Sequence, residues 1–497
     1  MSDSRWTMGD GRWMVLAASM LALAAAFTAP VLDARQMPAA PVYAIEGAKI
    51  VTGTATIDKG TLVIRNGVID DVGASVAMPH DAVVIDGTNA TVYPGLIDMA
   101  NTSAVEAPRT AAGSGAGEGA DAPQGGRGRG AAGGPAPTWA DADRAKRDAL
   151  LNPDFDAASH IRYEGVEMQR LAAAGITSVL AVPPAGLVKG ESALVNVAAP
   201  PDEDDVSRVA PYRRGTVVIA SPVAQHVTFA GGRGNGPGYP QALLGDIAFV
   251  RQAFADARWQ KEARAWAEKH KDQPRPAFEP ALDALASALD RKIPVAFEGG
   301  ELREILRALA MAKEFNLDPI VVGGIEADEA VADLKAANAR VILTVASGNP
   351  AQEGRGGGAG RGGQGRGGDV PVRVTRMQQN AVKVPAALEK AGILYAFSSE
   401  GLQNPADFLR DVARSVREGG LTEEQALRAL TVNAAKMAGA ADRLGTLAKG
   451  RIANVIVVEG SLFADQSRVR RVFVDGRPVN IDLPPAPAPQ GGRRGGL

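Results

Sequence analysis

Few residues of this chain are suited to chemistry. It contains no cysteine and four histidines, His80, His160, His226 and His270. Disulfides, thiolate zinc sites and cysteine nucleophiles are therefore excluded, and a histidine-rich metal centre would have to draw on these four. His226 follows a strand-like segment and precedes a Gly-rich stretch at 231–238, so it can face a pocket as a general base or substrate contact. The alternative is a loop histidine bonded to backbone.

A second candidate is the stretch 183–192, which the sequence predicts to be a loop after an apolar strand. Its glycines, with Lys189 and Ser192, could meet an anionic group, so we assign these two residues to substrate binding. Gly-rich loops are common, and no phosphate-loop, dinucleotide or nucleophile-elbow motif supports the assignment.

Composition limits the classes of protein. The chain has 497 residues, of which 45% are hydrophobic and 5% aromatic, with a formal net charge of −2. This length suits two or three domains, or one large barrel with extra segments. The balanced charge argues against a general nucleic-acid-binding protein.

The first residues predict export. Arg5 and Arg12 precede a long apolar run at 14–27, which Pro30 and Asp33 end. We interpret residues 1–34 as a signal peptide, and the alternative is a membrane anchor. The mature chain would be periplasmic or secreted, with no membrane attachment after cleavage.

Three segments are low in complexity: 111–137, 352–368 and the tail 483–497. They cannot bury a core, so we expect disordered insertions and a disordered tail. The two insertions follow predicted strands and could serve as lids or simply be solvated. Gly/Arg repeats can bind RNA, but export and the modest arginine count disfavour a nucleic-acid partner.

The remaining chain predicts two kinds of element. Short strands fill 42–94, with Asn66-Gly67 as a hairpin turn, and more strands follow residue 443. Between them, apolar strands alternate with amphipathic helices, which indicates a parallel sheet covered by helices. We assign seven strands to this sheet, the third at 215–220, and leave the fourth of an eight-stranded barrel unassigned. A long helix is predicted at 241–271.

Residues 94–98, Pro-Gly-Leu-Ile-Asp, resemble the barrel entry of the amidohydrolase superfamily, the imidazolonepropionase-like metal-dependent hydrolases. Residues 444–451 resemble the return from that barrel. The resemblance implies an α/β fold in which a TIM-like (β/α)8 barrel, 95–442, is inserted into a small composite β-sandwich formed by 42–94 and 443–482. It also implies a hydrolase of non-peptide carbon–nitrogen bonds.

The resemblance implies metal-ligand positions too, and this chain departs from them. Ala100 and Thr102 stand where the family has a His-x-His pair, and Gly323 or Gly324 where many members have another histidine. Glu298 replaces a histidine. Glu400 replaces an aspartate that acts as ligand and proton shuttle. The usual zinc site is therefore predicted to be missing.

Glu298 and Glu400 remain as acidic groups, with Asp98 as a third that is usually structural in the family. They could hold a divalent metal such as Mg²⁺ or Ca²⁺, act as a metal-free acid and base, or be satisfied by neighbours in a vestigial site. The catalytic candidates are Glu400, Glu298 and His226.

We therefore predict an exported amidohydrolase-family protein, acting on a small molecule if active, whose site is non-standard. The alternative is a catalytically inactive pseudoenzyme that serves as a binding or partner subunit of a competent amidohydrolase. The sequence leaves open a homo-oligomer and a pairing with such a relative.

Overall fold

The computed structural model describes residues 41–106, 138–162, 166–197, 218–231, 238–345, 372–402 and 404–482. Residues Val42–Leu497 form one compact unit. The predicted signal peptide, the two insertions at 111–137 and 352–368, and the tail at 483–497 lie outside the described residues.

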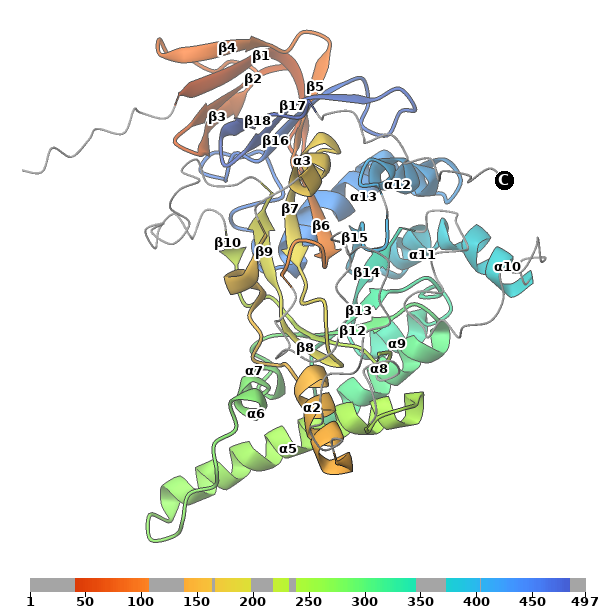
Figure 1. Cartoon of the computed structure of the whole chain (residues 1–497). Helices are drawn as coiled ribbons and strands as arrows, with labels where there is room; N and C mark the ends of the chain where they lie inside the picture. The colour runs from red at the N-terminus through yellow and green to blue at the C-terminus, as the bar shows by residue number, and fades with distance from the viewer. Residues whose placement is uncertain are drawn as a thin grey trace, which may run out of the picture. The chain divides into compact units, whose positions relative to one another are not determined.

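Strands from both ends of the chain build one sheet. Their order is β18-β17-β16-β5-β1-β2-β3, with β4 paired to β1. In chain order these strands are β1 (Val42–Val51), β2 (Thr56–Arg65), β3 (Val68–Gly73), β4 (Ala82–Asp86), β5 (Ala90–Pro94), β16 (Val455–Glu459), β17 (Arg468–Val474) and β18 (Arg477–Val479). The two ends meet where β16 pairs antiparallel with β5, as Figure 1 shows in blue and orange. The composite β-rich domain is therefore confirmed.

The hairpin between β2 and β3 forms as predicted. Asn66 and Gly67 adopt positive φ angles of 52° and 83°, which these two residue types tolerate best. The chain then leaves the β-rich domain through β5 and enters the barrel.

The barrel strands form two sheets, β10-β9-β7-β6 and β15-β14-β13-β12-β11-β8. In chain order they are β6 (Leu96–Asn101), β7 (Ile176–Ala181), β8 (Val188–Glu191), β9 (Ala193–Asn196), β10 (Val218–Ala220), β11 (Gln225–Val227), β12 (Val295–Gly299), β13 (Pro319–Gly323), β14 (Arg340–Thr344) and β15 (Tyr395–Ser398). Strands β11 to β15 pair in parallel, as do β6 and β7. This confirms the mixed α/β barrel class.

One barrel position differs from the prediction. Strands β8 and β9 are two halves of a single reversed segment, interrupted at Ser192, that is antiparallel to β7 on one side and to β10 and β11 on the other. Backbone bonds from Ser192 N to Ala224 O (2.9 Å) and from Val223 N to Ser192 O (2.8 Å) carry the pairing across the interruption. The interpretation of 183–192 as a loop is therefore wrong for 188–191, and the unassigned strand is β11.

Gly190 explains the error. A glycine in a candidate strand suggests a turn, but here it permits a close approach. Its φ is +120°, and a Cβ atom at this position would lie 2.4 Å from the carbonyl oxygen of Phe155. The glycine thus marks a strand pressed against another segment.

Helices pack against the barrel strands. In chain order they are α2 (Trp139–Leu150), the short 3₁₀ turn η1 (Ala157–His160), α3 (Val166–Ala173), α5 (Leu243–Lys269), α6 (Pro280–Ala284), α7 (Ala286–Leu289), α8 (Leu302–Phe315), α9 (Val331–Ala336), α10 (Val372–Ala381), α11 (Val384–Ala391), α12 (Asp407–Arg417), α13 (Glu423–Arg428), the π turn η3 (Ala429–Asn433) and α14 (Ala434–Met437). Helix α8, for example, packs against β12 and β13, and α14 packs against β15 and β6. The predicted helix at 241–271 is α5, and the capping box of Thr422 and Gln425 opens α13. No helix within the described ranges is long and apolar enough to cross a membrane.

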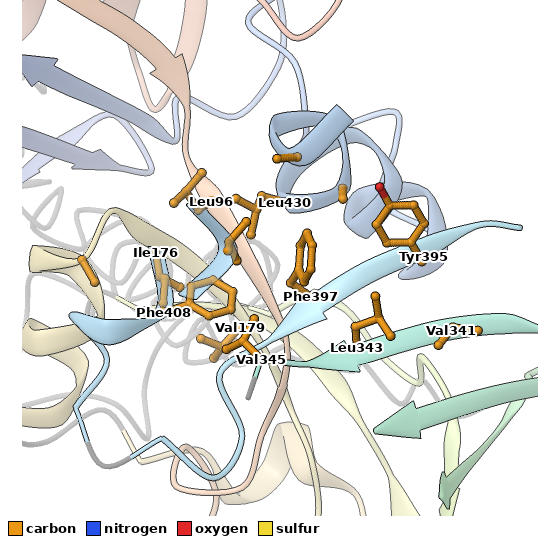
Figure 2. Close-up of a cluster of buried hydrophobic side chains, with 14 of the residues drawn as sticks. Leu96, Ile176, Val179, Val341, Leu343, Val345, Tyr395, Phe397, Phe408 and Leu430 are labelled. Atoms are coloured by element: carbon orange, nitrogen blue, oxygen red, sulfur yellow. The ribbon is translucent and has the colours of Figure 1, made fainter. Parts of the chain in front are cut away.

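Side chains alternate across the barrel wall with the period of two expected of strands. On β15, Tyr395 and Phe397 belong to the outer cluster that Figure 2 shows with Phe408 and Leu430, whereas Ala396 belongs to an inner cluster. The inner cluster also contains Ala224 before β11 and Ala296 on β12. Two residues further along, His226 and Glu298 therefore share the inner face.

Candidate functional site

Lys189, His226 and Glu298 come from three neighbouring strands, β8, β11 and β12. In the ladders His226 stands opposite Gly190 on one side and Ala296 on the other. Lys189 Nζ donates to Glu298 Oε1. Because β11 lies between β8 and β12, this ion pair crosses β11 on the inner face, where His226 lies.

The ion pair is unevenly buried. The Lys189 side chain is 9% exposed and that of Glu298 34%. Removing an ammonium group from water costs free energy that only a close partner can offset, so the carboxylate of Glu298 is committed to Lys189.

His226 is fully buried, and neither ring nitrogen has a hydrogen-bond partner among the described residues. Burial, together with the positive charge of Lys189, lowers the pKa of His226 to about 3. The imidazole is therefore neutral at pH 7. Because its pKa lies far below the working pH, it is a weak general base.

Asp98 and Glu400 occupy a different place, the seam between β15 and β6. Ser399, just after β15, donates to Asp98 twice, from its backbone N (2.8 Å) and from Oγ (2.5 Å). Ser398 Oγ donates to Ala100 O (2.8 Å). These side-chain bonds connect the last barrel strand to the first.

The seam continues at Glu400, whose two oxygens both accept from Thr102. The backbone N of Thr102 lies 2.9 Å from Oε2, and its Oγ1 lies 2.8 Å from Oε1. Glu400 thus fastens the residue that follows β6, and both of its oxygens are engaged.

Asp98 is wholly buried, and burial raises its pKa to about 6, although the bonds from Ser399 and Asn101 oppose this rise. It has neutral hydrogen-bond donors around it. These donors offset only part of the cost of burying the carboxylate, and the bonds they make suit a structural role at the seam.

Ser192 does not join the site. It is fully buried between β8 and β9, and its Oγ donates to Ala224 O at 3.3 Å. Of the two residues assigned to substrate binding, the structure brings only Lys189 to the inner face beside Glu298 and His226.

Asn454 is a buried polar residue whose role the sequence did not indicate. Its Nδ2 donates to Ser178 Oγ (3.0 Å) and to Asn196 Oδ1 (2.8 Å), and its Oδ1 accepts from Asp475 N (2.8 Å). It joins barrel strands β7 and β9 to the β-rich domain. The only signal in the sequence was a polar residue directly before an apolar strand.

The residues at the family's ligand positions do not fit a metal centre. Ala100 offers no ligand atom, and Thr102 is bonded to Glu400. Gly324 adopts a φ of +58°, and a Cβ atom there would lie 2.8 Å from Val341, so a histidine would clash. Within the described part of the chain no group of three or more His, Asp or Glu side chains could hold a metal ion.

Comparison with known proteins agrees with this fold. The model of the amidohydrolase family matches residues 252–479. The chain is similar to an amidohydrolase from Thermotoga maritima MSB8, with a TM-score of 0.66 and 20% identity, over 88% of this chain and 99% of that one. An adenosine deaminase from Xanthomonas campestris with bound zinc matches more weakly, with a TM-score of 0.44 and 15% identity over 88% and 92% of the two chains. No curated protein sequence matches.

The amidohydrolase resemblance read from residues 94–98 is therefore confirmed: the chain has the amidohydrolase fold, and its region 252–479 matches that family. The Thermotoga likeness supports the fold alone, because the identity is low. What the site does has to be argued from its own residues.

Proposed function

We propose that this chain is a non-catalytic member of the amidohydrolase fold, a binding or partner subunit, in which internal contacts replace the metal centre. One observation carries the proposal. Both glutamates that remain at ligand positions are engaged within the chain, Glu298 by Lys189 and Glu400 by Thr102.

The competing function is a metal-free acid–base hydrolase using Glu400, Glu298 and His226. The seam and the inner site draw on different strands, and His226 is a weak base because its pKa is about 3. A hydrolase would also need a group that activates water. The geometry therefore favours binding over hydrolysis.

Turnover tests the proposal. The full chain would be assayed with a panel of amides and cyclic amides, with and without added Zn²⁺, Mn²⁺ or Mg²⁺. We expect no hydrolysis above that of an unrelated protein carried through the same purification. Turnover that is lost in Glu400→Gln and kept in Glu459→Gln, an exposed glutamate paired with Arg470, would contradict the proposal and favour the enzyme.

We also propose that the chain is exported to the periplasm or secreted, which rests on the apolar run at 14–27 after two arginines. Cell fractionation followed by N-terminal sequencing of the mature protein tests this. A chain that keeps its first residues in the cytoplasm would refute export.

A further inference from the structure

We infer that Lys189 is a built-in counter-cation: its ammonium group takes the place beside Glu298 and His226 that a divalent metal ion would otherwise occupy, so removing Lys189 creates a metal site. The inference rests on the proposed function, since it assumes that the wild-type chain works without a metal. Three observations carry it.

The first is the shared location of the three groups. Lys189, His226 and Glu298 lie on the inner face of adjacent strands, and the Lys189–Glu298 contact crosses the strand that carries His226. A positive charge placed here contacts a carboxylate and lies on the same face as an imidazole.

The second is the unused capacity of His226. The ring is fully buried, and both of its nitrogens lack partners among the described residues. A buried polar group without a partner costs about 1–3 kcal/mol. Such a group therefore indicates either a bound ligand or the former place of one. A neutral imidazole has one lone pair ready for a metal.

The third is charge balance. The carboxylate of Glu298 needs a nearby cation, and Lys189 supplies it from a side chain that is only 9% exposed. A divalent ion would have to displace this ammonium group and would be repelled by it. Wild-type protein therefore excludes the metal.

Lys189→Ala changes this balance. It frees the Glu298 carboxylate, removes the repelling charge from His226, and empties the volume of the lysine side chain. A nitrogen and a carboxylate oxygen remain as ligand atoms. Zn²⁺ and Co²⁺ accept this combination of ligands.

The experiment compares metal binding by wild-type and Lys189→Ala full-length protein. Zn²⁺ is titrated calorimetrically, and Co²⁺ is followed by its visible absorption, which strengthens when the aqueous ion enters a lower-coordinate protein site. We expect Lys189→Ala to bind at least about tenfold more tightly than wild type, a difference of about 1.4 kcal/mol. Adding Glu298→Gln or His226→Leu to Lys189→Ala should abolish the gain.

Lys189→Met is the matched control, since it removes the charge but keeps most of the side-chain volume; it should bind less tightly than Lys189→Ala. Lys189→Ser provides a second small variant should the alanine variant not fold, with the same expected gain. Circular dichroism confirms the fold of each variant.

The outcomes separate the two proposals. The counter-cation inference is overturned if Lys189→Ala binds metal no more tightly than wild type. It is also overturned if the added binding survives His226→Leu and Glu298→Gln. Either result leaves the proposed function standing. Stoichiometric binding by wild type would overturn both.

Discussion

The β15–β6 seam and the inner face of β8, β11 and β12 both carry acidic side chains, but they treat them differently. At the seam Asp98 and Glu400 accept hydrogen bonds from neutral donors, the backbone and hydroxyl groups of Ser399 and Thr102. On the inner face Glu298 meets a full positive charge, and His226 beside it has no partner in the described part of the chain.

The carboxylates at the seam therefore serve a structural role, whereas the carboxylate on the inner face serves an electrostatic one. Neutral donors fix geometry and hold two strands together. An ion pair inside a barrel balances the charge of the carboxylate. The seam should therefore govern stability, whereas the inner face should govern ion binding.

The largest effect is expected at the seam. Asp98→Ala removes the acceptor of both Ser399 bonds and leaves buried donors unpaired, so we expect a loss of about 3–4 kcal/mol in the free energy of unfolding. Urea denaturation measures it. Asp71→Ala, at an exposed position on β3, is the control and should change stability by less than about 0.5 kcal/mol. A loss of that small size at Asp98 would show that the seam is not held by this residue.

The next effect separates the regions by pH. His226 has a pKa lowered to about 3, so its contribution to stability is present above its ordinary pKa of about 6.5 and is lost as the pH falls through 3. Asp98 has a pKa raised to about 6, so its contribution is present below about 3.9 and is lost as the pH rises through 6. Between about pH 3.9 and 6, lowering the pH therefore weakens the contribution of His226 to stability and strengthens that of Asp98.

His226→Leu should therefore gain stability relative to wild type as the pH falls from 6.5 towards 3, because the variant has no imidazole to protonate. At pH 7 the two proteins should differ by no more than about 1 kcal/mol, since the ring has no hydrogen bond to the described residues that the change would break. Unfolding measured across this range tests it. Parallel pH profiles for the two proteins would show that His226 is not held neutral by burial.

On the inner face, Lys189→Met should destabilise the protein by about 1–3 kcal/mol, because it leaves Glu298 without its cation. The cost is moderated since Glu298 is partly exposed and can be hydrated. The double variant Lys189→Met/Glu298→Gln should recover much of the loss, giving a coupling energy in a double-mutant cycle. Additive losses would mean that the two residues do not depend on each other.

The smallest effect is expected at Glu400→Gln, about 1 kcal/mol, because the amide keeps one acceptor for Thr102. Thr102→Val removes the hydroxyl donor, and the two changes should be less than additive in thermal unfolding. Full additivity would indicate that the contact between Glu400 and Thr102 is not formed in solution.

Local signals in the sequence identified much of the fold. Asn66-Gly67 predicted a hairpin because both residues tolerate positive φ, and residues 94–98 located the barrel entry. The reversed strand β8 was missed because Gly190 suggests a turn when its close neighbour Phe155 is not known. Local backbone propensity carries no information about such close contacts between segments that are distant in sequence.

The candidate site was identified only in part for the same reason. The residue types of Glu298, Glu400, His226 and Lys189 suggested chemistry, but their partners are set by strand register. Lys189 meets Glu298 across 109 positions of sequence, and Thr102 meets Glu400 across 298. No local sequence pattern predicts these pairs. The pairs nevertheless determine whether a carboxylate is free to bind a ligand or is already hydrogen-bonded within the chain.

The central claim, that internal contacts have replaced the metal, is tested most directly by metal content. The full chain would be purified without chelator and its metals quantified by elemental mass spectrometry, beside Glu298→Gln and Glu400→Gln. The account predicts that wild type carries far less than stoichiometric metal and that neither variant changes the amount. Stoichiometric zinc in wild type that falls in either variant would contradict it.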